Sequence, residues 1–238
     1  MRKKYLLGAA VSVLALAFAA MAFASPQFKQ TDKVKYTKNK GKVSAGISTT
    51  LESTDPGAQP PGNQPAADKA VLKFKGAKVD SKGAPQCSSG KAQAAQCPSN
   101  SKVGTGSAEA NIVGTNPTTG VTTVTPLHNL HVTAFNGKGK LYLLIKETGT
   151  LLKASLTKNG TLTTNVKRDT PPLPGGNKVV LTKFQLKTKA KSRKIHGKRH
   201  IMIRTPKCPK SKKWKISVAF TYSDGTSDKQ TLTQKCKR

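Results

Sequence analysis

The sequence predicts an all-β protein, an antiparallel β-sandwich of immunoglobulin-like or jelly-roll-like type with about ten short strands and two disulfides. Three observations lead to this fold class. Apolar and polar residues alternate in short runs along most of the chain, as in strands that bury one face. Beyond the N-terminal segment, no helical apolar stripe exceeds two turns. An even number of cysteines follows an export signal, which favours a disulfide-bonded extracellular domain.

The N-terminal segment reads as a secretory signal peptide over residues 1–24. Arg2, Lys3 and Lys4 precede an apolar run over 6–23, and Ala22 and Ala24 give the small-x-small pattern of a cleavage site. An uncleaved membrane anchor is the alternative, because the run approaches the ~20 residues that span a bilayer. The cleavage pattern followed by Ser25-Pro26 argues against it. The mature protein is therefore expected to be secreted or in the cell envelope, with no transmembrane segment.

The four cysteines are Cys87, Cys97, Cys208 and Cys236. Four cysteines allow three pairings. Pairing within each half would join Cys87 to Cys97 and Cys208 to Cys236. A zinc site is the competing interpretation, but no two of the four have the short C-x₂₋₄-C spacing of zinc ligands. We therefore expect two disulfides.

The clearest strand covers 214–222, where Trp214, Ile216, Val218, Phe220 and Tyr222 fall on one face. Asp224-Gly225 then supplies a hairpin turn, and 227–234 forms the returning strand. An antiparallel hairpin brings its two ends together. It therefore places Cys236 near Cys208, which supports the local pairing.

Weaker strand patterns lie elsewhere, and three segments rich in Pro, Thr or Gly read as connections. The expected strands are 71–79, 106–113, 130–135, 141–147, 151–157, 162–167, 179–188 and 199–205, with one or two more in 34–49. The expected connections are 53–69, 115–126 and 170–177. We divide the mature chain into a basic N-terminal strand region with a Pro-rich connector (25–70) and a β-sandwich domain (71–238). A division of the mature chain into two small domains remains open.

Two sequence elements resemble a known group of proteins. One is Cys97-Pro98 followed by Val103-Gly104-Thr105-Gly106. The other starts at Cys208-Pro209 and continues through Trp214, then Phe220 to Thr226, and ends at Cys236. Together they are similar to a group of uncharacterised exported bacterial β-domain proteins with paired Cys-Pro elements. The resemblance covers about 71–238 and implies export, a β fold and two disulfides, and it carries no active-site residue.

Charge is the strongest functional signal. The chain has 42 Lys and Arg against 10 Asp and Glu, a net charge of +32, and without the leader's three basic residues the balance is 39 − 10 = +29. Such a protein attracts polyanions and repels cations. The densest basic segment runs from 187 to 200, where alternate residues would share one face of a strand. Candidate polyanion-binding residues are Lys187, Lys189, Lys191, Arg193, Lys194, Lys198, Arg199, Arg204 and Lys207. Lys33, Lys35, Lys38, Lys40 and Lys42 form a further basic set.

The composition of the basic segment limits the classes of polyanion that it is expected to bind. It contains no aromatic residue for base stacking, and Lys outnumbers Arg, which favours point-charge contacts over bidentate readout. Sequence-specific nucleic-acid recognition is therefore not expected. In an exported protein the expected partners are anionic envelope glycopolymers or acidic polysaccharide, bound electrostatically and without catalysis, cofactor or metal.

Two other functions remain open. A purely structural envelope module would use its charge only for solubility. A polysaccharide lyase acting on acidic glycans would need basic residues and proton-transfer groups, for which His128, His131 and Tyr142 are the available types. No glycosidase carboxylate pair and no Gly-x-Ser-x-Gly motif is visible. His196 and His200 could hold a metal at helical spacing, but the surrounding lysines would repel it.

Overall fold

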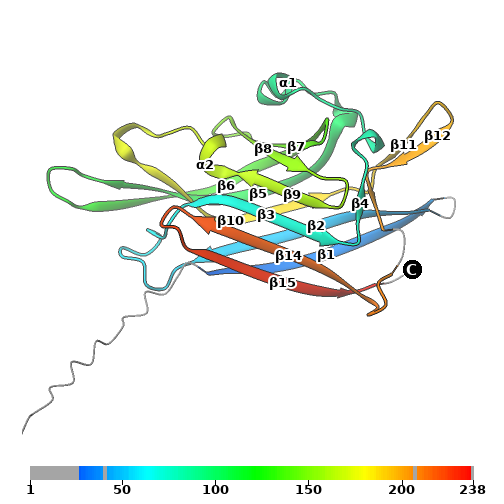
Figure 1. The fold of residues 1–238 in the computed structure, drawn as a ribbon. Helices are drawn as coiled ribbons and strands as arrows, with labels where there is room; N and C mark the ends of the chain where they lie inside the picture. The colour runs from blue at the N-terminus through cyan, green and yellow to red at the C-terminus, as the bar shows by residue number, and fades with distance from the viewer. Residues whose placement is uncertain (1–26, 40–41, 206–207, 237–238) are drawn as a thin grey trace, which may run out of the picture.

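The computed structural model describes residues 27–39, 42–205 and 208–236, and strands dominate it (Figure 1). Its strands are β1 (Gln27–Asn39), β2 (Lys42–Thr54), β3 (Ala67–Lys75), β4 (Lys78–Val79), β5 (Lys102–Thr115), β6 (Thr122–Gly137), β7 (Lys140–Ile145), β8 (Thr150–Leu156), β9 (Thr161–Asn165), β10 (Lys178–Thr188), β11 (Ser192–Ile195), β12 (Lys198–Ile201), β13 (Ile203–Arg204), β14 (Lys213–Tyr222) and β15 (Ser227–Lys235). The helical turns are η1 (Ser81–Gly83), α1 (Ser89–Gln93), η2 (Ser99–Ser101), α2 (Val166–Asp169) and η3 (Pro174–Gly176).

One antiparallel sheet contains every strand except the β11–β12 hairpin. Its order is β15-β14-β3-β9-β8-β7-β6-β5-β10-β2-β13-β4, and β1 pairs with β2. The sheet folds over on itself into two layers (Figure 1). Inward side chains of β3 and β14, such as Phe74 and Trp214, share one buried cluster with Leu141 and Leu143 of β7. The predicted all-β sandwich is therefore confirmed, with more than the expected ten strands.

The two outermost long strands, β1 and β15, close the fold without a backbone ladder. The amide of Phe28 donates to Asp228 Oδ2 at 3.1 Å, and that of Gln30 donates to Gln230 Oε1 at 3.1 Å. The Gln230 amide group donates back to the Phe28 carbonyl. Both residue numbers rise together along this contact, so the two strands run parallel. Side chains of β15 thus form hydrogen bonds with backbone groups at the edge of β1.

The predicted C-terminal hairpin is confirmed. The five residues expected to point inward on β14 are all buried, and their neighbours Lys213, Lys215 and Thr221 are exposed. Gly225 takes a positive φ of 83°, and its amide donates to the Tyr222 carbonyl at 3.0 Å. The strand patterns around it are also confirmed, because each expected strand overlaps one in the sheet.

The predicted connection over 115–126 is present but shorter, over 116–121. β5 extends to Thr115 and β6 begins at Thr122, so they form one long hairpin. The Thr115 and Thr122 hydroxyls lie 3.0 Å apart across it, and threonine is a good strand former. Pro126 pairs only with Asn111 of β5, because the ladder of β6 with β7 begins at Val132. At Pro126 the other side of β6 is therefore an unpaired edge, where proline is tolerated.

Strands from both predicted regions of the mature chain lie in one sheet. The predicted boundary at residue 70 falls inside β3, and β2 pairs with β10 over 183–187. The predicted leader and its cleavage residues Ala22 and Ala24 lie outside the described residues. Within the described ranges, the helices are all too short or too polar to cross a bilayer.

Both predicted disulfides are present. Cys87 bonds to Cys97 with their Cα atoms 5.6 Å apart, and Cys208 bonds to Cys236 at 5.9 Å. The first disulfide holds the segment around α1 over the outer face of β6, β7 and β8. This cover buries a second apolar cluster whose main members are Ala92, Phe135, Tyr142, Leu144 and Leu151.

Candidate anion-binding surface

The predicted basic segment over 187–200 forms a bent hairpin and not one strand. β10 ends at Thr188, and β11 and β12 follow as a separate two-stranded sheet. His196 and Gly197 both take positive φ values, 47° and 73°, in a two-residue loop between Ile195 and Lys198. Such a loop is a type I′ hairpin turn. Lys187, Lys189, Lys191 and Arg193 therefore do not share one strand face, which corrects the expected alignment.

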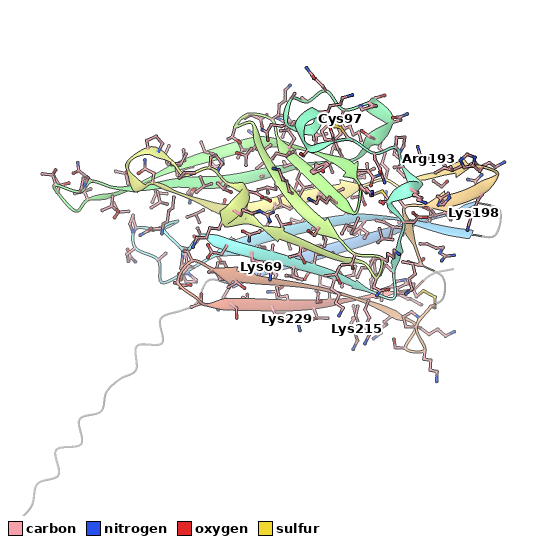
Figure 2. The ribbon with its side chains drawn as sticks, turned by 45° about the horizontal axis from the view of Figure 1, so that its top comes forward. Lys69, Cys97, Arg193, Lys198, Lys215 and Lys229 are labelled. Carbon is pink, nitrogen blue, oxygen red and sulfur yellow. A yellow bond between two sulfur atoms is a disulfide. The ribbon has the colours of Figure 1, made fainter. Side chains whose placement is uncertain are left out.

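The hairpin nevertheless presents several cations together (Figure 2). Arg193 and Lys198 are exposed, and Lys194 is exposed between them in sequence. Arg193 Nε donates to the Lys82 carbonyl at 2.9 Å, which ties the hairpin to η1. Arg199 Nη1 donates to Ser192 Oγ at 3.1 Å. Lys207, also predicted for this site, lies outside the described residues.

A polar cleft of about 240 Å³ lies at the base of the hairpin. Four cationic side chains contribute to its wall, together with one acid and one histidine. The lining residues are Lys78, Val79, Asp80, Lys198, Arg199, His200, Ile201 and Arg204. We call this the basic cleft. Three of the predicted site residues, Lys198, Arg199 and Arg204, meet here. Lys78 and Asp80 were not predicted, because no pattern in the sequence links them to this site.

An Asp–His pair forms part of the wall of the basic cleft. His200 Nδ1 lies 2.7 Å from Asp80 Oδ2, and the His200 side chain is 15% exposed. The Lys82 amide donates to Asp80 Oδ1 at 2.9 Å. Burial raises the pKa of Asp80, but the hydrogen bonds from His200 and Lys82 outweigh it and leave that pKa below its usual value. Asp80 is therefore a stable anion that holds the His200 ring.

A second, larger basic surface covers the outer side of four neighbouring strands. Its members are exposed lysines at alternate positions of each strand. We call this surface the lysine face; it consists of Lys69, Lys73 and Lys75 on β3, Lys213 and Lys215 on β14, Lys229 and Lys235 on β15, and Lys29, Lys33 and Lys35 on β1. Lys69, Lys215 and Lys229 are labelled in Figure 2. Of this set, only Lys33, Lys35 and Lys213 lie in the basic runs that the sequence itself shows.

The strand registers place these lysines next to one another. Lys215 lies directly opposite Lys75, and Lys213 lies opposite Lys235. Among the described residues, the outward positions of β3, β14, β15 and β1 hold no Asp or Glu. Alternation with inward-facing residues marks each lysine as outward on its own strand, but only the pairing of β3 with β14 brings the lysines of these two strands together.

Several of the acids lie near one end of the sheet. Asp55 follows β2, Asp68 lies at the start of β3, and Asp224 lies in the β14–β15 turn. Three cations form ion pairs with acids: Lys167 pairs with Asp68, Arg168 with Asp169, and Lys183 with Glu52 and Glu109. Over the described ranges, no residue of the lysine face and no lysine or arginine of the basic cleft has such a carboxylate partner.

The groups considered for a lyase do not converge. Tyr142 is buried beneath the α1 cover, whereas His128 and His131 are exposed on β6 beside Glu109 and Glu147. A β-bulge at this point, with Asn129 at a positive φ of 56°, leaves both histidines exposed. The described part of the chain contains no cluster of three or more His, Cys, Asp or Glu side chains that could hold a metal.

No family model matches the chain, and a search of curated proteins finds no match.

Proposed function

We propose that the protein is exported and binds anionic polymers electrostatically, without catalysis, through the lysine face and the cations of the β11–β12 hairpin. The observation that carries the proposal is the lysine face itself. It concentrates exposed lysines on adjacent strands with no outward acid among the described residues and no ion-pair partner. An anionic polymer carries condensed counter-cations, and unpaired lysines that neutralise its charges release them, so binding gains free energy from ion release.

The spacing of the lysine face suits an extended polymer. Neighbouring strands lie ~5 Å apart, and alternate residues on one strand lie ~7 Å apart. A polymer with one charge every few ångströms can therefore contact several lysines at once. A single exposed ion pair contributes only ~0–1 kcal/mol, so affinity requires many contacts along one chain. This requirement favours polymers over small anions as ligands of the lysine face.

Anionic envelope glycopolymers fit this surface better than nucleic acid does. The outward residues of β3, β14 and β15 are Lys, Thr, Ser, Val and Ala, and none is aromatic. Base stacking, which supports single-strand binding, is therefore missing from these three strands. The two disulfides are compatible with an oxidising, extracellular setting, where teichoic acids and acidic polysaccharides are accessible.

The test compares two charge-matched variants of the oxidised protein. One replaces Lys73, Lys75, Lys215 and Lys229 by Gln in the lysine face. The control replaces Lys91, Lys138, Lys146 and Lys153 by Gln, which are also exposed but lie on or beside the other layer. Both lose four charges. Binding to purified teichoic acid, a polyuronate, duplex DNA and a neutral glucan is titrated from about 50 to about 200 mM salt.

We expect the lysine-face variant to bind polyanions more weakly and with a shallower salt slope, by up to about 0.7–0.9 per lost contact. The control should bind as the unmodified protein does, and the neutral glucan should not bind. Equal losses in the two variants would mean that net charge alone drives binding, and the proposal would then be rejected in favour of a structural module with solubilising charge.

A further inference from the structure

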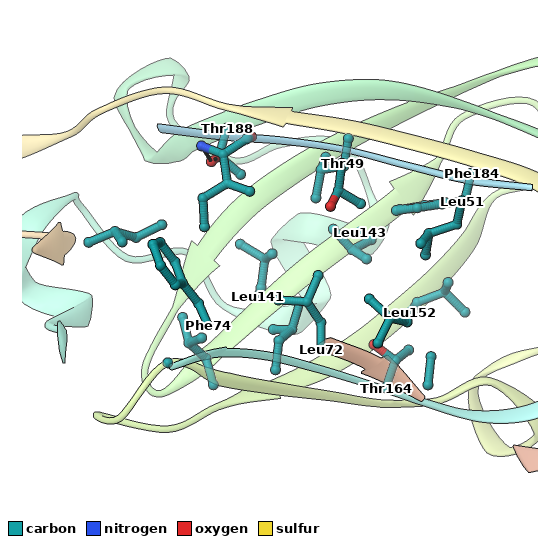
Figure 3. Close-up of a pocket in the computed structure, with 18 of the residues that line it drawn as sticks. Thr49, Leu51, Leu72, Phe74, Leu141, Leu143, Leu152, Thr164, Phe184 and Thr188 are labelled. Carbon is teal, nitrogen blue, oxygen red and sulfur yellow. Dashed lines mark hydrogen bonds between the residues drawn. The ribbon is translucent and has the colours of Figure 1, made fainter. Parts of the chain in front are cut away.

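An apolar cavity of about 140 Å³ lies inside the sandwich, between β2 and β10 on one side and β3 and β9 on the other (Figure 3). Its wall contains no charged residue, and leucines such as Leu72, Leu141, Leu143 and Leu152 form much of it. Thr188 is one of its few polar members, and its hydroxyl is already hydrogen-bonded to the Ile47 backbone. An apolar cavity of this size stays dry and admits apolar molecules: a cavity of about 150 Å³ holds benzene.

The cavity and the basic cleft share a wall. Val79 lines both. It belongs to β4, which pairs with β13 so that Val79 lies opposite Ile203 and Lys78 lies opposite Arg204. Val79 and Ile203 line the cavity, whereas Lys78 and Arg204 line the cleft. The apolar compartment and the cationic one therefore adjoin at these two short strands.

This juxtaposition matches the two parts of an amphiphile. We propose that the protein binds a single-chain anionic amphiphile, with about six carbons of the chain in the cavity and the head group in the basic cleft at Lys78, Lys198, Arg199 and Arg204. The chain length follows from the cavity volume, since benzene has six carbons. The head-group charge follows from four cations against the single acid Asp80. This inference does not depend on polymer binding by the lysine face.

Carboxylate and phosphate head groups share the required chemistry, so both are probes. Octanoate and octyl phosphate are titrated calorimetrically into the oxidised protein, alongside neutral 1-octanol and cationic octylammonium. Trp214, the single tryptophan of the chain, gives a second readout. The centroids of the Trp214 and Phe74 rings are 5.5 Å apart in an edge-to-face arrangement, and Phe74 lines the cavity. Occupancy of the cavity should therefore change Trp214 fluorescence.

We expect at least one anionic probe to bind with one-to-one stoichiometry. 1-Octanol should bind at least tenfold more weakly, and octylammonium should not bind. Removing one methylene from the chain should weaken binding about fourfold, which corresponds to about 0.8 kcal/mol per buried methylene. Equal affinity for 1-octanol and both anionic probes would exclude a role for the basic cleft.

Variants separate the two compartments. Leu143→Phe fills the cavity and should abolish binding of every probe while leaving the unfolding temperature unchanged or raised. Val79→Phe, at a half-buried position, places a larger side chain where the two compartments meet. It tests whether the probes occupy the cavity if Leu143→Phe does not fold. Arg204→Gln should weaken anionic probes about tenfold without changing 1-octanol binding. Val121→Phe and Lys229→Gln, which lie outside both compartments, should behave as the unmodified protein.

Unchanged probe binding in Leu143→Phe and Val79→Phe would place the amphiphile elsewhere and overturn the proposal. The lysine-face variant described above keeps both compartments intact. It should lose polymer binding and retain amphiphile binding, so failure of one proposal is distinguishable from failure of the other.

Discussion

At the scale of single residues, Asn136 is the most constrained polar side chain in the structure's core. It is 0% exposed. Its Nδ2 lies 2.7 Å from the Ser81 carbonyl, 2.9 Å from that of Ala84 and 3.2 Å from that of Pro85. The backbone carbonyl of Asn136 in turn accepts from the Cys87 backbone amide at 2.8 Å. One amide group thus fastens the segment that leads into the α1 cover.

We expect Asn136→Leu to destabilise the fold by roughly 2–4 kcal/mol, because it leaves buried carbonyls without a donor. Asn136→Asp should cost more, since it places a carboxylate against the same carbonyls and provides no donor. Urea denaturation of both variants measures the difference. A smaller loss in Asn136→Asp than in Asn136→Leu would contradict this account.

Tyr222 is the residue whose titration is most altered. Burial, more than any other effect, raises its pKa to about 12, and the nearby Asp228 and Asp224 add to the rise. The neutral phenol is therefore favoured by the fold, so Tyr222 contributes stability below pH 10 that is lost as pH rises from about 10 to about 12. In an ultraviolet titration, the difference between the unmodified protein and Tyr222→Phe should be a single transition near pH 12. A difference transition near pH 10 would exclude a buried neutral phenol.

At the scale of the elements, the contact between β1 and β15 is held by side chains where a sheet would use backbone. Gln230 both accepts from the Gln30 amide and donates to the Phe28 carbonyl. We expect Gln230→Ala to reduce stability by about 1–3 kcal/mol and to speed amide exchange along β1. Thr231→Ala is the matched control, because Thr231 is the next residue and is exposed on the outer face. Unchanged exchange in β1 would mean that this contact does not hold the fold closed.

The same elements show how far sequence reasoning reached. Alternation predicted β14 and β15 because one face of each strand meets the core. The pattern is most regular in β14, where every second residue from Trp214 to Tyr222 is buried. It did not predict the hairpin extension over 115–122, whose Thr-rich strands form a ladder with little burial. Nor could it predict the basic cleft. Lys78 and Arg204 are 126 residues apart in sequence, and only the β4–β13 pairing joins them.

At the scale of the whole molecule, charge is segregated along the sheet. The paired cations lie with the acids around α2 and the ends of β2 and β3, whereas the lysine face has like charges on adjacent strands, such as Lys215 opposite Lys75. Like charges directly opposite each other destabilise a strand pair. A surface of this kind costs stability, so the requirements of folding alone do not account for its lysines.

Lys215→Glu tests this relation between stability and binding. It replaces the repulsion with Lys75 by an attraction, so we expect it to stabilise the protein by about 0.2–1 kcal/mol while weakening binding to teichoic acid. The gain should shrink as salt rises from about 10 mM to about 1 M, because the Debye length falls from about 30 to about 3 Å. Lys153→Glu, on β8 in the other layer, is the control and should change polymer binding less. If Lys215→Glu lowers stability at low salt, then repulsion between Lys215 and Lys75 does not destabilise the fold. If Lys153→Glu weakens polymer binding as much as Lys215→Glu does, then the polymer does not bind preferentially at the lysine face.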